Sequence, residues 1–74
     1  MRQYVIYQNP IDFPGKVVAR GFTIGPGWLE PDGGPLYVGT SLTDARIAIA
    51  RRDPGLIRIS AEYSDEPQIV EVWI

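Results

Sequence analysis

Apolar residues fall into short runs in the first half of the chain, and each run has the composition of a β-strand. The run YVIY at residues 4–7 is β-branched and aromatic and predicts a first strand over about residues 3–8. Residues 16–24 carry apolar side chains near both ends and predict a second strand that pairs back onto the first. Gly21, inside that strand, indicates a bulge or a close backbone approach. Residues 36–38 predict a third, brief strand.

Two later segments alternate between apolar and polar positions, as half-buried strands do. In residues 56–60, Ile57 and Ile59 point to one side and Arg58 to the other. Residues 68–74 form the last predicted strand. Its alternation places one set of side chains on each face: Val70, Val72 and Ile74 on one, and Ile69, Glu71 and Trp73 on the other.

A helix is predicted between the third and fourth strands. Ser41 suits the N-cap, and Asp44 three residues later completes a pattern close to a capping box. Arg51 and Arg52 suit the opposite end, and Asp53-Pro54-Gly55 stops the helix. At about 100° per residue, one stripe faces the core. It consists of Leu42, Ala45, Ala48 and Ile49, and Ile47 points away.

These elements predict an α+β fold in a single domain over residues 1–74. The expected architecture is a small antiparallel sheet of four to five strands, in the order β-β-β-α-β-β, with one helix packed on one face. The predicted core between helix and sheet contains Val5 or Ile6, Val18, Leu42, Ile49, Ile57, Ile59, Val70 and Val72.

One helix covers only one face of such a sheet. Ile69 and Trp73 are expected on the uncovered face, joined from the first strand either by Tyr4 with Ile6 or by Val5 with Tyr7. Two outcomes are open. The face is an apolar patch of the size that marks an interaction surface, or the glycine- and proline-rich stretch folds back over it.

That stretch, GFTIGPGWLEPDGGP at residues 21–35, holds a single tryptophan. A phosphate cradle is not expected, because the stretch runs between strands, has no lysine and brings in Glu30 and Asp32. We expect an ordered loop over residues 25–35, stiffened by Pro26, Pro31 and Pro35, with Asp32-Gly33-Gly34 forming a turn that needs positive φ.

Trp28 and Leu29 are the candidate binding residues of this loop, together with Ile69 and Trp73 of the last strand. Glu30 and Asp32 would favour a positively charged partner. The structural alternative makes Trp28 a lid packed on Ile69 or Trp73.

Composition adds mainly exclusions. The 74 residues include no cysteine and no histidine, which removes thiolate ligands, the commonest metal ligand and the commonest general base. The net charge of -2 gives no general attraction to nucleic acid or to an anionic membrane. Apolar runs are far shorter than the roughly twenty residues that span a bilayer. The first predicted strand begins too early to leave room for a signal peptide, so a cytoplasmic setting is expected.

Charged and hydroxyl residues form no convincing catalytic or metal site. Glu62, Asp65 and Glu66 match no ion-binding loop and are expected in a solvated turn. Four arginines lie at positions 46, 51, 52 and 58. They could form a basic spot that binds phosphate or an acidic partner, but the preferred expectation is that they compensate the helix dipole and keep the surface soluble. Ser41, Thr43 and Ser60 lack a basic partner that would activate them. We therefore expect no enzymatic activity, no catalytic residue, no cofactor and no metal.

Three segments together, YVIY, NPIDFPGKVVARGFTIGPG and the closing IVEVWI, resemble a set of short proteins of unassigned function from bacterial and phage genomes. These share a DFP segment, a following VVAR strand and a terminal VEVW-like strand. The resemblance covers most of the chain and implies an accessory protein of bacterial or phage origin. The leading hypothesis is a small non-enzymatic interaction protein that binds a protein partner or forms a weak homodimer. The alternatives are a phage-type inhibitor of a host defence complex, similar to anti-CRISPR proteins, and an enzyme that uses carboxylates alone.

Overall fold

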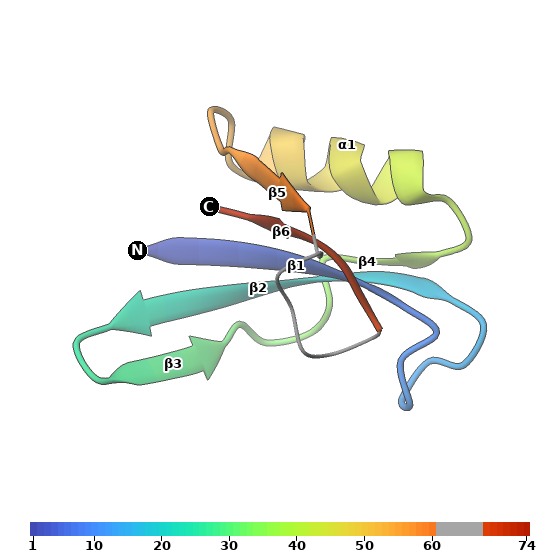
Figure 1. Cartoon of the computed structure of the whole chain (residues 1–74), viewed down its shortest axis with the longest axis horizontal. Helices are drawn as coiled ribbons and strands as arrows, with labels where there is room; N and C mark the ends of the chain where they lie inside the picture. Colours follow the sequence, from blue (N-terminus) through green and yellow to red (C-terminus); the bar gives the residue numbers. More distant parts are fainter. Residues whose placement is uncertain (61–67) are drawn as a thin grey trace.

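The computed structural model describes residues 1–60 and 68–74, and within them the chain forms one helix and a mixed-length set of antiparallel strands (Figure 1). The elements are β1 Arg2–Gln8, β2 Val17–Gly25, β3 Trp28–Pro31, β4 Tyr37–Gly39, α1 Leu42–Arg52, β5 Arg58–Ser60 and β6 Ile69–Trp73. The α+β class and the single helix are as predicted. The described residues hold six strands, because β3 was not expected, so the order is β-β-β-β-α-β-β.

The strands form one sheet in the spatial order β3-β2-β1-β6-β5, with β4 also paired to β2. Both β4 and β3 use the same edge of β2: β4 lies along residues 17–19 and β3 along residues 22–25. The β2–β3 hairpin extends away from α1, which packs across the other end of the sheet (Figure 1). One end of the sheet is therefore covered by the helix and the other is not.

Helix α1 has the predicted ends. The Ser41 hydroxyl accepts a hydrogen bond from the Asp44 backbone N–H at 3.1 Å, which satisfies one of the free donors of the first turn. At the other end the Asp53 N–H donates to the Ile49 carbonyl, and Gly55 turns the chain with φ of +91°. Among the residues the structure describes, no helix is long and apolar enough to cross a membrane.

The core lies between α1 and the sheet. Its buried members are Tyr4, Ile6, Ala19, Ala45 and Ile49, and the partly buried residues packed around them are Val17, Tyr37, Leu42, Leu56, Val70 and Trp73. Tyr4 pairs with Gly21 across β1 and β2, and a Cβ atom on Gly21 would lie 3.1 Å from the Tyr4 ring and 2.6 Å from the Asp32 carboxylate. The close approach predicted for Gly21 is thus present.

Several residues predicted for this core lie elsewhere. Of the two alternatives Val5 and Ile6, Ile6 is the one that lies in this core. Strand alternation and register place Val18, Ile59 and Val72 on the face of the sheet opposite α1, where Val18 is buried. Ile57 is wrong as a core residue: it precedes the short β5 and is 68% exposed. The sequence shows the two faces of each strand but not which face meets the helix, and this is why Tyr4 and Ile6 were left as one of two alternatives.

The face opposite α1 is partly covered by the β1–β2 connection, residues 9–16. Pro10 is buried and Phe13 is half-buried. The Arg20 guanidinium on this face lies 5.8 Å from the centre of the Phe13 ring and pairs with Asp12. Of the two outcomes left open above, the one in which the glycine- and proline-rich stretch folds back over this face is not found, because residues 28–31 form a strand of the sheet itself.

Candidate functional site

The glycine- and proline-rich stretch forms a β-hairpin rather than a loop. Trp28–Pro31 pairs with residues 22–25 of β2, and Pro26-Gly27 makes the two-residue connection. Gly27, at the third turn position, has the positive φ of +74° that a type II turn requires, and proline is common at the second position of such turns. The positive φ predicted within Asp32-Gly33-Gly34 is not found there, since neither glycine adopts it.

Trp28 lies at the start of β3, opposite Gly25. Its indole ring covers the Gly25 backbone so closely that a Cβ atom on Gly25 would be 2.1 Å from the ring. The side chain remains 50% exposed. Since β2 and β1 lie between β3 and β6, Trp28 does not reach Ile69 or Trp73. The lid interpretation is therefore wrong for these two residues.

Leu29 occupies the opposite face of β3 from Trp28. It pairs with Ile24 of β2 and is 58% exposed. We call residues 26–31 the hairpin tip, and all six of them are exposed. The tip therefore presents one large apolar side chain on each of its two faces.

The acidic residues near the tip have different environments. The Asp32 carboxylate pairs with Arg2 and accepts a hydrogen bond of 3.1 Å from the Thr23 hydroxyl. Arg2 in turn lies over the Tyr4 ring. Asp32 is thus part of the fold, and the positive partner charge that it was expected to attract is already supplied by Arg2. Glu30 remains exposed at the tip.

The outer edge of β3 has a defined hydrogen-bonding pattern. On the β1 side of β2, the Ile24 N–H donates to the carbonyl of Met1, which precedes β1. On the β3 side, the N–H of Asp32, directly after β3, donates to the Gly21 carbonyl. By strand alternation, Trp28 and Glu30 direct their backbone groups at β2, whereas Leu29 and Pro31 direct theirs outward. Within the described part of the chain, the Leu29 N–H and carbonyl meet no partner, and Pro31 has no N–H to offer.

Ile69 and Trp73, the other two candidate binding residues, lie on opposite faces of the sheet. The β1–β6 register shifts between Ile6 and Tyr7, which leaves Val70 as an extra residue in β6. Tyr4 pairs with Trp73 on the α1 face, and Tyr7 pairs with Ile69 on the other. Simple alternation placed both on one face, and the bulge is the reason that this was wrong.

Trp73 and Glu71 belong to a polar network that sequence reasoning missed. Glu71 is only 5% exposed, and its carboxylate accepts hydrogen bonds from Arg46 Nε at 2.9 and 3.1 Å and from Trp73 Nε1 at 3.2 Å. Arg58 Nη1 lies 3.5 Å from the same carboxylate. An acidic residue inside the apolar strand IVEVW was the available signal, because a buried carboxylate needs such partners.

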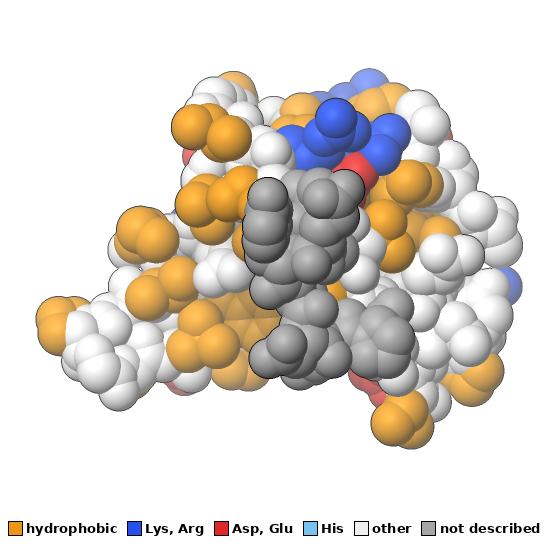
Figure 2. Space-filling view, in the orientation of Figure 1, with side chains coloured by type: hydrophobic (Ala, Val, Ile, Leu, Met, Phe, Trp, Pro, Cys, Tyr) orange, Lys and Arg blue, Asp and Glu red, His pale blue; other side chains and the backbone are white. Residues whose placement is uncertain are grey.

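This network sets the ionisation of Glu71. Burial by itself would raise the pKa of Glu71, but hydrogen bonds from Arg46 and Trp73 and the charges of Arg46 and Arg58 outweigh it, so the pKa is below its usual value. Basic side chains and an acidic one lie together near α1 in Figure 2. Of the four arginines considered above, two are therefore occupied by Glu71, whereas Arg51 and Arg52 remain in the last turn of α1.

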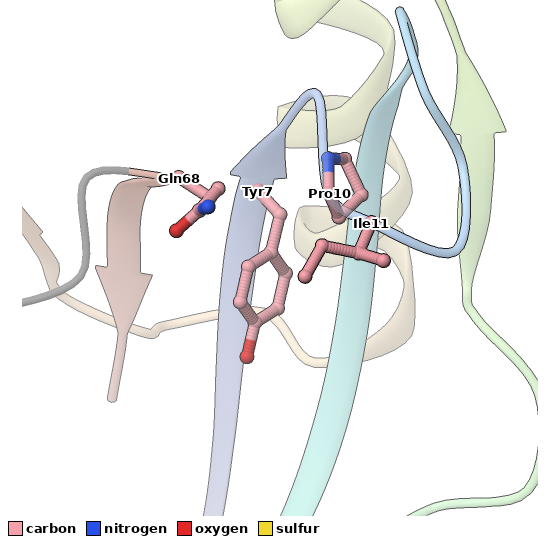
Figure 3. Close-up of a pocket in the computed structure, with 4 residues that line it drawn as sticks. All are labelled: Tyr7, Pro10, Ile11 and Gln68. Carbon is pink, nitrogen blue, oxygen red and sulfur yellow. The ribbon is translucent and has the colours of Figure 1, made fainter.

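A shallow apolar hollow of about 160 Å³ lies on the face opposite α1 (Figure 3). Tyr7, Pro10, Ile11 and Gln68 line it, and Figure 3 shows the Tyr7 ring beside Ile11. Ile11 is 92% exposed, so one wall is a side chain on an exposed connection. This hollow is a weaker candidate binding site than the hairpin tip, because the wall formed by Ile11 belongs to a connection and not to a paired strand.

Metal-ligating side chains do not gather in the part of the chain that the structure describes. The acidic residues Glu62, Asp65 and Glu66 lie outside the described residues, so the predicted solvated turn stays a prediction.

The chain matches no family model, and comparisons with curated proteins and with solved structures found no significant match. The segments that carry the resemblance noted above have structural places in the fold: residues 12–14 lie in the β1–β2 connection, residues 17–20 in β2 and residues 70–73 in β6.

Proposed function

We propose that this chain is a small, non-enzymatic protein-binding domain that contacts its partner with the hairpin tip. The observation that carries the proposal is the exposure of Trp28 and Leu29 on a strand pair that projects beyond the helix (Figure 1). Apolar side chains also lie along this projecting part in Figure 2.

The hairpin makes these side chains suitable for binding. The Trp28 ring lies over Gly25, and the backbone of Leu29 is paired with that of Ile24, so the backbone of this segment loses little conformational freedom when a partner covers it. A large aromatic side chain held in this way can bury much area with few torsions. The tip carries one acidic side chain, Glu30, so the partner surface that fits it is apolar and places no second carboxylate opposite Glu30.

The test compares the tip with an equally apolar site elsewhere. Leu29→Ala is expected to leave the unfolding midpoint close to that of the wild type, whereas Trp28→Ala is expected to lower it slightly, because Gly25 loses the ring that covers it. Both variants are expected to remain folded and to abolish recovery of the partner in an affinity pull-down from the source cells. Ile47→Ala is the matched control, because Ile47 is exposed on the outer side of α1. Recovery of the same partners by all three variants would contradict the proposal, and so would a loss with Ile47→Ala alone.

A further inference from the structure

We infer that a second copy of this chain pairs with it edge to edge through β3, in one antiparallel register centred on Leu29. This inference rests on the proposed function, since it names a partner for the hairpin tip. It follows from the outer edge of β3, where the Leu29 N–H and carbonyl point away from β2 and meet no partner within the described residues.

A two-fold axis at Leu29 satisfies both groups. In that arrangement the Leu29 N–H of each copy donates to the Leu29 carbonyl of the other, which forms the closely spaced hydrogen-bonded pair of an antiparallel ladder. The two Leu29 side chains then meet on one face of the joined sheet. This removes from water an apolar side chain that is more than half exposed in the single copy.

Pro31 and Glu30 select this register over its neighbours. A shift by one step would place Glu30 directly opposite Glu30 of the other copy, and like charges in facing positions are unfavourable. It would also require an N–H from Pro31, which has none. With Leu29 opposite itself, Glu30 faces the uncharged Trp28, and Pro31 lies beside the turn of the other hairpin, where the strand has ended.

The same features limit the assembly to two copies. The interface is isologous, which means that both copies contribute the same β3 edge. Once the pair has formed, neither copy has a free β3 edge for a third. Proline on an edge strand prevents a longer ladder. Since only a short strand contributes, the area buried between the two copies is well below that of a standard interface. The dimer is therefore weak and forms at high micromolar concentration.

Single cysteines test the register, because the natural chain has none. In a mildly oxidising buffer, Leu29→Cys is expected to form a disulfide dimer on the order of tenfold faster than Ile47→Cys, since facing Cα atoms of a hydrogen-bonded pair are within disulfide range. An equimolar mixture of Trp28→Cys and Glu30→Cys should form the mixed dimer faster than either variant forms its own. Circular dichroism confirms that each variant is folded.

The dimer is contradicted if Leu29→Cys crosslinks no faster than Ile47→Cys, or if the mixture gains nothing over its components. This failure is distinguishable from failure of the proposed function. Suppose that Leu29→Cys forms no crosslink, while Leu29→Ala loses a different protein from the pull-down. That result overturns the second copy as the partner, and the hairpin tip is then a binding site for an extended segment of the other protein.

Discussion

At the residue scale, glycines facing aromatic rings explain much of this small sheet. Tyr4 covers Gly21, Trp28 covers Gly25 and Tyr37 lies against Gly39, each so close that a Cβ atom would overlap or crowd the ring. An aromatic ring over a glycine shields the backbone and offsets the weak strand preference of that glycine. The sequence indicated a close approach at Gly21, but it could not show which ring made the contact, because the partners lie on different strands.

Glu71 gives a prediction about pH. Its folded-state pKa is below the usual glutamate value of about 4.3 in the unfolded chain, so its ion pairs stabilise the fold above that pH, and the effect is lost as the pH falls through the folded pKa. Glu71→Gln removes the charge and should lower the free energy of unfolding by roughly 1 to 3 kcal/mol at pH 7.

Urea titrations at a series of pH values measure this effect. The wild-type curve is expected to fall more steeply than the Glu71→Gln curve below about pH 5, and the two should converge in acid. Parallel curves over the whole range would show that the Glu71 carboxylate makes no net electrostatic contribution.

At the element scale, the elements that could be predicted were those whose start and end residues lie within the same short segment of sequence. Helix α1 has its N-cap serine, its terminal arginines and its stop at Asp53-Pro54-Gly55, and all lie within one continuous segment. Strand β3 was missed because Glu30 and Pro31 disfavour a strand and because the pairing with residues 22–25 that stabilises it does not show in its own four residues. The type II turn at Pro26-Gly27 was a readable signal for that hairpin, but the prolines and glycines around it favoured a loop.

The hairpin turn gives a matched pair of variants. Gly27 has φ of +74°, which a residue with a Cβ atom adopts at a cost, so Gly27→Ala should destabilise the domain by roughly 1 kcal/mol. Gly33 does not have positive φ and has open space where a Cβ atom would lie, so Gly33→Ala should change stability by less than about 0.5 kcal/mol. Thermal unfolding of both variants measures the difference. Equal effects would argue against the Pro26-Gly27 turn.

At the scale of the whole molecule, the sequence predicted a helix layer on a sheet layer, but not which face of the sheet meets the helix. One helix on one face of an antiparallel sheet follows from the patterns, whereas the face that meets α1 depends on the Val70 bulge and on pairings between distant strands. The candidate binding residues were likewise only partly predictable from the sequence. Trp28 and Leu29 are exposed, while Trp73 is bound into the Glu71 network and packs against the core.

Two isoleucines should separate the core from the surface. Ile49 is fully buried between α1 and the sheet, and Ile49→Ala should cost about 2 to 5 kcal/mol, a large share of the stability of a domain of this size. The exposed Ile57 should tolerate the same truncation with a change below about 0.5 kcal/mol. Chemical denaturation checks both values, and similar losses in the two variants would contradict the assigned core.

The proposed function requires that residues 28–31 form an edge strand that displays Trp28 and Leu29. Amide hydrogen exchange, measured residue by residue at low protein concentration, tests it most directly. Exchange rates are expected to alternate: the Trp28 and Glu30 amides are protected because they donate to β2, and the Leu29 amide between them exchanges much faster because it points outward. Fast exchange at all three amides would mean that the segment is a loop, and protection at all three would mean that its outer edge is already covered. Either result would rule out a free edge strand at residues 28–31.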